Sequence, residues 1–587
     1  MRTKRLFILT MIYTALIFLL IGRLWYIQVV MGEHYKLVAQ GNRIRFLRLK
    51  ATRGLIYDRS GAPLAINLPS FGLSIIPASL GDDFLLRRFL KDLSAEIGIP
   101  YKEIWRNYRR RVRSRYWPVL LVDNLTLPQI VDIRDWLSSH PFLSVEAGSR
   151  RFYPWGGLFS HVLGYTAEIS EKELKSYGEM GYRGGDQIGK MGLEKVYEEY
   201  LRGMDGYKEI EIDALGRKVS VLDRLPPRRG YDLILNIDRH LQKVAYDALG
   251  DNRGCVILMD PRDGSVLVMV SKPSFDPNRF VWGIDPYEWK AIIGNPLHPM
   301  LNRATQAELP PGSLFKVVTA MAALSEGITN PGRKILCTGS IKIGNRVFKC
   351  WKEGGHGWVN IYQAIAHSCN VYFYTVGKEL GIKRLSRYAE ACGFGKKTGV
   401  DLVSEADGFV PTPAWKRRRL GEAWYPGDTV NLSIGQGYLL VTPIQMACLV
   451  SAIANGGTIF KPRIARALRD SDGNVVKEFE PVVSMKLPFS KGIIDQVKRG
   501  MRLAVKEGTA RVLSGMKVKV AGKTGSAQNP GGREHAWFMG FAPYGNPSIV
   551  IVVMVEEGGA GGAVAAPIAK KVLDFYFRRY GNGGGKV

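Results

Sequence analysis

Acidic residues are scarce in this 587-residue sequence: 53 Asp and Glu stand against 82 Lys and Arg, which gives a formal net charge of +29. Such an excess of positive charge indicates an anionic partner. The sequence contains no zinc-finger, helix-turn-helix or RNP-like signature, so its residues give no support to nucleic acid as that partner. Anionic lipid headgroups, a pyrophosphate-linked substrate or an acidic polymer fit the charge equally well.

Long uncharged runs are also rare. One run, residues 6–22, approaches the length of about 20 apolar residues that spans a bilayer as a helix, and apolar residues continue beyond it to position 30. No small-x-small cleavage site follows it, which favours a retained anchor over a cleaved signal peptide. Because Arg2, Lys4 and Arg5 precede the run, we expect a cytoplasmic N-terminus and an extracytoplasmic chain after Met31.

The composition excludes a disordered chain, since 46% of the residues are hydrophobic and 23% are charged. The length exceeds what one ordinary core accommodates, so two or more domains are expected. Residues 224–230 contain two prolines and three arginines and are the best candidate for a linker. We therefore predict an anchor at 1–30, a non-catalytic region at 31–230 with an inserted lobe at about 70–148, and a catalytic domain at 231–587.

Beyond the linker, residues 231–237 alternate as a strand, and Asp238 is placed to cap a helix that ends near residue 249. Residues 254–259 and 265–271 then form a predicted hairpin. A strand, a helix and two strands predict the start of an α/β domain with an antiparallel sheet.

Residues 309–324 begin with a Pro-Pro-Gly turn and continue as the apolar run of a buried helix, which places Ser313 at or just inside the helix start. Lys316 lies on the same face, so the hydroxyl and the amine can approach within hydrogen-bonding range. A serine nucleophile needs an adjacent base, and burial pushes a lysine towards its neutral form. Taken alone, the pattern fits a helix cap followed by a solvated lysine better than it fits a catalytic pair.

Two further patterns follow in the chain. Ser368-Cys369-Asn370 comes directly after a predicted helical segment at 361–366, and Lys523-Thr524-Gly525-Ser526 is expected at the end of a strand that includes residues 517–521. Ser-x-x-Lys, Ser-x-Asn and Lys-Thr-Gly, in this order, are the signature of penicillin-binding proteins and class A β-lactamases. The presence of all three motifs in this order argues against a chance match.

With these motifs and residues 53–67, the chain resembles the class B penicillin-binding proteins over nearly its whole length, and residues 351–357 are most similar to the penicillin-binding protein 2 branch. The resemblance implies an α/β multidomain fold. It comprises an N-terminal transmembrane helix, an elongated β-rich pedestal with an inserted helical head lobe, and a transpeptidase domain in which helices flank an antiparallel sheet.

The resemblance also implies a function. The expected protein is a peptidoglycan D,D-transpeptidase of the inner membrane that cross-links stem peptides through a serine acyl-enzyme during cell-wall elongation and is inhibited by β-lactams. Its implied partners are a SEDS-family, RodA-type glycosyltransferase and an MreC-type scaffold. The alternatives are a division-specific class B transpeptidase, because several elongation enzymes have aspartate where this chain has Asn370, and a non-catalytic scaffold or sensor that activates a glycosyltransferase.

Chemistry and resemblance together predict a role for each motif residue, and none of these roles needs a cofactor. Ser313 is the expected nucleophile and Lys316 its base, while Ser368 relays a proton to the leaving amine. The expected substrate contacts are the donor peptide amide at Asn370, the terminal carboxylate at Lys523 and Thr524, close backbone approach at Gly525, and an oxyanion hole of the Ser313 and Ser526 N–H groups.

Cysteine is also scarce, with six in the chain. Cys337, Cys350, His356 and Cys369 form a Cys3His set that suits a structural zinc ion. Some relatives carry zinc in this region on Asp, Asp, His and Cys ligands, so the resemblance implies that Cys337 and Cys350 replace the two aspartates. The alternative is a Cys337–Cys350 disulfide. The other three, at positions 255, 392 and 448, are expected to be inert core residues.

Overall fold

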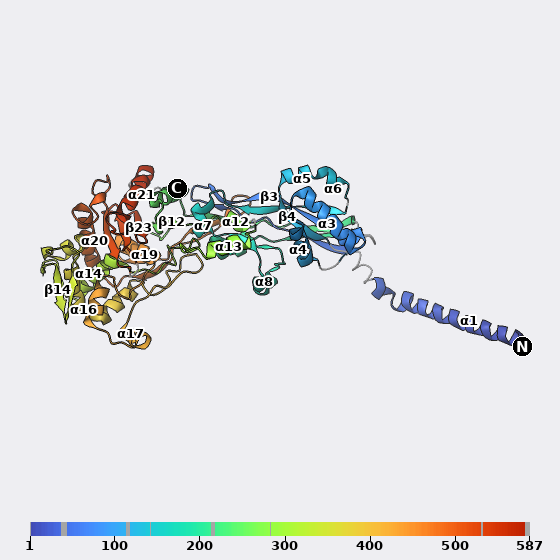
Figure 1. Cartoon of the computed structure of the whole chain (residues 1–587), viewed down its shortest axis with the longest axis horizontal. Coiled ribbons are helices and arrows are strands. Elements are labelled where there is room, and N and C mark those ends of the chain that lie inside the picture. Colours follow the sequence, from blue (N-terminus) through green and yellow to red (C-terminus); the bar gives the residue numbers. More distant parts are fainter. Residues whose placement is uncertain are drawn as a thin grey trace. The chain divides into compact units, whose positions relative to one another are not determined.

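A computed structural model of the chain describes residues 2–36, 44–112, 115, 118–140, 142–212, 218–281, 283–529 and 532–581. Contacts within the chain group it into two compact units, shown in Figure 1 with colours that follow the sequence. The first unit comprises Met1–Arg53, Pro69–Ser149 and Arg202–Gly230, and the second comprises Gly54–Leu68, Arg150–Leu201 and Tyr231–Val587.

The first unit begins with helix α1 (Arg2–Trp25), which continues as the π-helical turn η1 (Tyr26–Val30). Together, residues Thr3–Val30 are long and apolar enough to cross a membrane, and no other helix in the described part of the chain is. Apolar side chains such as Leu9 and Phe18 are more than half exposed on this helix, as expected for a surface that faces lipid.

The rest of the first unit contains a helical lobe with its own core and a separate antiparallel sheet in the order β1-β8-β9. In the lobe, Asp82 caps α3 by accepting a hydrogen bond from Leu85 N, and Gly98 ends that helix in the left-handed conformation. The elements are β1 (Ile44–Leu49), η2 (Pro77–Leu80), α3 (Asp83–Ile97), α4 (Tyr101–Arg111), β4 (Val119–Leu125), α5 (Leu127–Asp132), α6 (Arg134–Ser138), β8 (Gly206–Ile212), β9 (Lys218–Leu225), and parts of β3 (Pro63–Ile75) and β5 (Leu143–Phe152).

The second unit is organised around a five-stranded antiparallel sheet in the order β12-β11-β23-β22-β21. Strand β11 (Gly254–Met259), the second in this order, is buried throughout, because both faces of the sheet are covered. Val256 packs in one core with residues of α11 and α21, and Ile257 packs in the other with residues of α14 and α19. The other strands and these helices are β12 (Val266–Lys272), β21 (Ala521–Ala527), β22 (His535–Ala542), β23 (Ile549–Val555), α11 (Arg239–Leu249), α14 (Lys316–Ser325), α19 (Pro443–Asn455) and α21 (Ala565–Tyr580).

The helix and the hairpin predicted after residue 230 are confirmed: Asp238 accepts hydrogen bonds from His240 N and Leu241 N at the start of α11, and β11 pairs with β12. The strand predicted before them is present as β10 (Asp232–Leu235), but it belongs to another sheet. One prediction was wrong. The Lys523–Ser526 motif does lie near the end of a strand, β21, but residues 517–520 lie outside that strand. The reason is that β21 is defined by its pairing with β22, whose partners run from Ala521 to Ala527.

The second unit also contains helices and short strands outside this sheet. They are β2 (Ile56–Tyr57), η3 (Gly156–Phe159), α7 (Ser160–Leu163), β6 (Thr166–Glu168), α8 (Glu171–Tyr177), η4 (Gly178–Met180), β7 (Gln187–Gly189), α9 (Gly192–Val196), α10 (Glu198–Leu201), β10 (Asp232–Leu235), α12 (Asn278–Val281), α13 (Pro286–Ile293), η5 (Gly312–Leu314), β13 (Ile335–Cys337), β14 (Ser340–Ile343), β15 (Arg346–Lys349), β16 (Gly357–Val359), α15 (Ile361–Ala366), α16 (Asn370–Ala391), α17 (Pro413–Leu420), α18 (Pro426–Ser433), β17 (Thr458–Phe460), β18 (Ala465–Arg469), β19 (Val475–Glu478), β20 (Val483–Lys486), α20 (Lys491–Lys506) and η6 (Arg511–Leu513).

Candidate active site

Ser313 lies in the tight turn η5, directly before α14 begins at Lys316. The turn packs backbone against backbone on β21. A Cβ atom on Gly312, whose φ is 53°, would lie 2.7 Å from the carbonyl oxygen of Ser526. On its other side, Gly312 N donates to the carbonyl of Gly435 at 2.9 Å. Only glycine fits between these two backbones, so the turn carries Ser313 to the strand that contains Ser526.

Within this turn, Ser313 is half-buried, whereas Gly312 and Leu314 are buried. Its hydroxyl has no hydrogen-bond partner among the residues that the structure describes. The side chain is therefore both reachable from solvent and free to rotate, two properties that a nucleophile needs.

Lys316 is completely buried, and its amine makes three polar contacts. The Nζ atom lies 2.8 Å from the carbonyl oxygen of Ser368, 3.1 Å from the Ser368 hydroxyl and 2.7 Å from Asn370 Oδ1. Burial lowers the pKa of Lys316 to about 8. Either protonation state can satisfy this shell, because an ammonium donates to all three oxygens and a neutral amine donates to two and accepts from the hydroxyl. Burial favours the neutral form.

The sequence predicted that the Ser313 hydroxyl and the Lys316 amine could approach within hydrogen-bonding range. In the structure the amine instead contacts Ser368 and Asn370. The reason is that those two residues offer three oxygen atoms to a buried amine, and a buried polar group takes the partners that satisfy it.

Ser368 occupies a strained backbone position between α15, which ends at Ala366, and α16, which begins at Asn370. Its φ is +55°, a left-handed conformation that is uncommon for a residue with a side chain. The Trp351 indole N–H holds this bend by donating to the carbonyls of His367 at 3.0 Å and Ser368 at 3.2 Å. Sequence reasoning missed this contact, because nothing in the spacing of a tryptophan marks which carbonyl it reaches.

Lys523, in β21, is also completely buried, and its Nζ donates to the carbonyl of Thr524 at 2.8 Å. Burial and the nearby Lys316 lower the pKa of Lys523 well below its usual value. Gly525 is closely packed, since a Cβ there would lie 3.0 Å from the carbonyl of Pro311. The Ser526 hydroxyl accepts a hydrogen bond from Gly561 N at 3.2 Å.

The structure also gathers the four predicted metal ligands. The ligand atoms of Cys337, Cys350, His356 and Cys369 all lie within 4.8 Å of one another. His356 Nδ1 is 3.6 Å from Cys337 Sγ and 3.5 Å from Cys350 Sγ. A tetrahedral Zn²⁺ with ordinary bond lengths separates its nitrogen and sulfur ligands by about 3.6 Å, so the donor set fits this ion.

The protonation states in the cluster suit a metal as well. A hydrogen bond from Cys369, supported by backbone N–H groups that include Asn370 N, lowers the pKa of Cys350 to about 4 and favours its thiolate. Burial lowers the pKa of His356, which favours the neutral imidazole that binds metals. The cysteines are free thiols in the structure, and the three outside the cluster are buried, with pKa values that burial raises.

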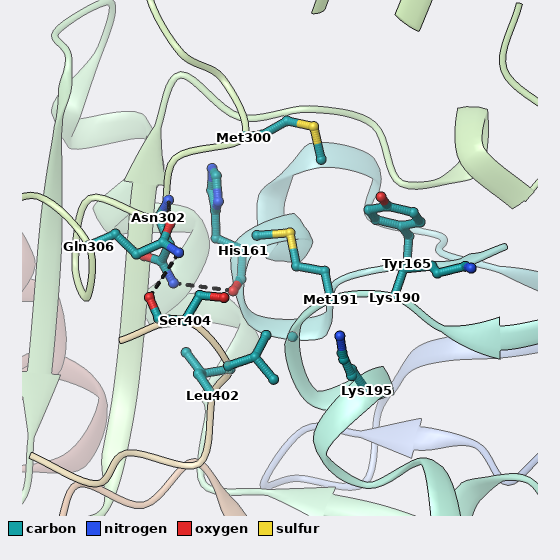
Figure 2. Close-up of a pocket in the computed structure, with 12 residues that line it drawn as sticks. His161, Tyr165, Lys190, Met191, Lys195, Met300, Asn302, Gln306, Leu402 and Ser404 are labelled. Carbon is teal, nitrogen blue, oxygen red and sulfur yellow. Dashed lines mark hydrogen bonds between the residues drawn. The ribbon is translucent and has the colours of Figure 1, made fainter. Parts of the chain in front are cut away.

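A pocket of about 220 Å³ lies elsewhere in the second unit, and none of the residues predicted for catalysis or metal binding lines it. Figure 2 shows two hydrogen bonds that join its walls: Asn302 Nδ2 donates to the His161 carbonyl at 3.3 Å, and Gln306 Nε2 donates to the Ser404 carbonyl at 3.0 Å. Burial lowers the pKa of His161 to about 4, so its ring is neutral. The catalytic groups are therefore distinct from this cavity.

Two family descriptions match the chain. Residues 254–574 match the penicillin binding protein transpeptidase domain, and residues 48–235 match the penicillin-binding protein dimerisation domain. The first match contains every residue of the Ser313, Ser368 and Lys523 motifs and the whole cysteine and histidine cluster.

The chain is also similar to characterised proteins over nearly its full length. It is 35% identical to the peptidoglycan D,D-transpeptidase MrdA of Haemophilus influenzae over 98% of this chain and 92% of that protein. Penicillin-binding protein 2 in the complex with MreC from Helicobacter pylori is 31% identical, with a TM-score of 0.82 over 92% of this chain and 99% of that one. A chain of a peptidoglycan synthase complex that coordinates polymerization and crosslinking is 32% identical, with a TM-score of 0.72 over 99% and 100% of the two chains.

Proposed function

The chain belongs to the penicillin-binding protein 2 branch of the class B penicillin-binding proteins and is a peptidoglycan D,D-transpeptidase, and on this premise we propose which residues perform the transfer. Ser313 Oγ attacks the carbonyl carbon of the penultimate D-alanine of a stem peptide. The C–O bond of the acyl-enzyme forms, the C–N bond breaks, and D-alanine leaves with a proton on its amine. The amine of a second stem peptide then attacks the ester, which forms the cross-link and returns the proton to Ser313.

Lys316 is the proposed base for the attack. Support comes from the complete burial of its amine, which favours the neutral form and is the observation that carries this proposal, together with the contact of the amine with the Ser368 hydroxyl at 3.1 Å. Catalytic hydrogen bonds are often long or poorly aligned before substrate binds and tighten in the Michaelis complex, so the lack of a hydrogen bond between Ser313 and Lys316 among the described residues does not argue against this base. Ser368, whose hydroxyl is already at the amine, is placed to pass the proton on to the leaving group.

Asn370 is proposed to orient Lys316 in addition to its expected contact with the peptide amide. Its Oδ1 accepts from the amine, and its Nδ2 donates to the Lys349 carbonyl at 3.3 Å. A neutral amide satisfies an N–H group without adding a negative charge, whereas a carboxylate at this place would stabilise the ammonium form. Asparagine therefore helps to keep the Lys316 amine unprotonated, and so able to accept a proton, near neutral pH.

The pH dependence of acylation tests this role. The second-order rate of acylation by penicillin should rise with pH and reach half of its plateau near pH 8, because the protonated Lys316 amine below that pH cannot accept the serine proton. In Asn370→Asp the midpoint should move upward by about one pH unit, because an adjacent negative charge stabilises the ammonium. A midpoint unchanged in this variant would contradict the proposed base, and Asn455→Asp, away from these contacts, is the matched control.

Lys523 and Thr524 are proposed to bind the terminal carboxylate of the stem peptide or of a β-lactam. In the free enzyme, burial holds Lys523 towards its neutral form, and an arriving carboxylate stabilises the ammonium by direct charge attraction. The proposed oxyanion hole consists of the backbone N–H groups of Ser313 and Ser526, supported by the backbone contact at Gly312 that joins their segments. Each hydrogen-bond donor of an oxyanion hole typically raises the reaction rate by a factor of about 10²–10³.

A structural zinc ion is proposed for the cluster of Cys337, Cys350, His356 and Cys369. The ion would take no part in the transpeptidation reaction. Its four ligands would link three segments of the chain. Because Cys369 stands between Ser368 and Asn370, the ligand set would hold the catalytic loop at its strained bend. The spacing of His356 Nδ1 from two thiol sulfurs supports zinc over a disulfide.

The zinc content of the purified protein tests this site. Elemental analysis should find about one zinc ion per chain, and Cys337→Ser should lose most of it because it removes one of four ligands. Cys392→Ser, which removes a buried cysteine outside the cluster, should keep the full zinc content. A wild-type chain without zinc, in which mass spectrometry finds Cys337 linked to Cys350, would instead establish the disulfide.

The proposed setting is the cytoplasmic membrane. Arg2, Lys4 and Arg5 ahead of the apolar helix support a cytoplasmic N-terminus and a catalytic domain on the other side. We propose an MreC-type scaffold and a SEDS-family, RodA-type glycosyltransferase as partners, since similar chains occur with MreC and in a synthase complex that couples polymerization to crosslinking. The relatives' names favour elongation over division. The boundary proposed between the pedestal at 31–230 and the transpeptidase at 231–587 is supported by the two family matches, one of which ends at residue 235 while the other begins at residue 254. By contacts, Gly54–Leu68 and Arg150–Leu201 of the proposed pedestal group with the transpeptidase.

A further inference from the structure

Thr509 lies between α20 and η6, outside every motif named so far, and its side chain reaches into the candidate active site. The hydroxyls of Thr524 and Thr509 are 2.6 Å apart, with Thr524 donating. Thr524 is 5% exposed, and Thr509 is the only hydrogen-bond partner of its hydroxyl in the described part of the chain. The residue proposed to bind the substrate carboxylate is thus held by one side chain.

The backbone of Thr509 is itself tightly placed. Its N–H donates to the carbonyl of Ala366 at 3.2 Å, and a Cβ on the preceding Gly508 would lie 2.2 Å from the same oxygen. From the other side, a Cβ on Gly562 would lie 2.6 Å from the Thr509 carbonyl. Because Ala366 ends the helix directly before the Ser368 loop, Thr509 connects that loop to the strand that carries Thr524.

The Thr524 hydroxyl must change its hydrogen-bond partner when a substrate binds. A hydroxyl has one proton to donate, and a carboxylate oxygen can only accept. When Thr524 turns its proton to the carboxylate, it can no longer donate to Thr509, so the pair stays bonded only if Thr509 then donates to Thr524. A threonine can make this exchange because its hydroxyl both accepts and donates. Without the Thr509 hydroxyl, the buried Thr524 oxygen would lose a hydrogen-bond partner in either the free or the substrate-bound enzyme, which is unfavourable.

We propose that Thr509 is a positioning residue for recognition of the substrate carboxylate, holding the Thr524 hydroxyl in the free enzyme and turning its proton towards the carboxylate when substrate binds. The inference rests on the proposed role of Thr524. It makes the 509 position a determinant of specificity for donors that end in a free carboxylate, and it assigns Thr509 no contact with the reacting bond.

A pair of substrates isolates this role. N-benzoyl-D-alanylthioglycolate ends in a carboxylate, and its methyl ester presents the same thioester without that charge. In Thr509→Val, which keeps the side-chain shape and removes the hydroxyl, KM for the acid should rise about tenfold with kcat nearly unchanged, because one hydrogen bond to a charged group is weakened. The kinetics of the methyl ester should not change.

Conservative and matched variants complete the test. Thr509→Ser keeps the hydroxyl and should restore the wild-type KM. Thr398→Val removes another half-buried threonine hydroxyl, one that bonds to Glu405, and should leave both substrates unaffected. Equal losses on acid and ester, or a Thr509→Ser variant no better than Thr509→Val, would reduce Thr509 to a packing residue and overturn the inference. If Thr509→Val does not yield folded protein, Thr509→Ala is measured against the same expectations.

Thr524→Val separates the inference from its premise. If Thr524→Val raises KM for the acid and Thr509→Val does not, the role of Thr524 stands and the inference about Thr509 is wrong. If neither variant affects the acid selectively, the proposed carboxylate site is wrong, and the inference is overturned with it, while covalent labelling of Ser313 by penicillin would still be expected.

Discussion

Replacing Ser313 by alanine abolishes covalent labelling of the protein by fluorescent penicillin. The expected loss is complete because the β-lactam carbonyl then has no hydroxyl to form an ester with, and a water molecule cannot take its place in a stable adduct. Membranes or purified protein are incubated with the reagent, denatured and separated, and the fluorescence of the 587-residue polypeptide is measured. Ser386→Ala, which removes a buried serine hydroxyl that bonds to the Pro411 carbonyl, should label like the wild type.

This result discriminates between two serines. The hydroxyl that is hydrogen-bonded to the Lys316 amine in the described residues belongs to Ser368, at 3.1 Å, so this contact alone would favour Ser368 as the nucleophile. Exposure favours Ser313, because Ser368 is only 6% exposed and Ser313 is half-buried. Mass spectrometry of the acylated peptide should therefore find the drug on Ser313. Drug attached to Ser368, or unchanged labelling of Ser313→Ala, would refute the proposed mechanism.

Replacing Lys316 by methionine should lower the second-order rate of acylation by about 10²–10⁴, the range that general base catalysis contributes. Methionine is close in size to the lysine stem and fills the same buried volume, so the loss reports the amine and not a cavity. Ser313 remains in place, and slow labelling at long times is therefore expected to persist. The rate is measured by stopped-flow or by quenched labelling at pH 8.5, where the wild-type amine is mostly unprotonated.

Lys498→Met is the matched control for this variant. Lys498 is largely buried in α20 and donates to the Ala454 carbonyl at 3.2 Å, so its removal also costs a buried amine and one hydrogen bond. It should acylate at the wild-type rate. A Lys316→Met enzyme that acylates as fast as this control would show that another group removes the serine proton.

Much of the candidate active site could be predicted from sequence because its parts are local. Ser313 and Lys316 belong to one turn and the helix after it, and Ser368 and Asn370 flank a single residue. Reactive side chains at such short spacing in sequence are also close in space, so a sequence motif is enough to predict their chemistry. The same holds for the anchor and for α11, whose ends follow from a capping aspartate and the apolar pattern.

Other features could not be predicted because they depend on contacts between distant segments. The strand that contains Lys523 begins at Ala521, because pairing with β22 and not the alternation of residues 517–521 defines it. Trp351 and Thr509 reach carbonyl and hydroxyl groups 17 and 15 positions away, at Ser368 and Thr524. No local pattern records such a contact.

By itself, the sequence determined which chemical groups the protein has and the order in which they follow one another, since motif spacing, apolar runs and charge are properties of the chain. Only the tertiary structure decided which groups meet: the amine of Lys316 with Ser368 and Asn370, and the thiols of three separate segments with His356. The physical reason is burial. Folding removes these groups from water, and each must then find its partner, and acquire its pKa, from whatever the packing of remote segments places beside it.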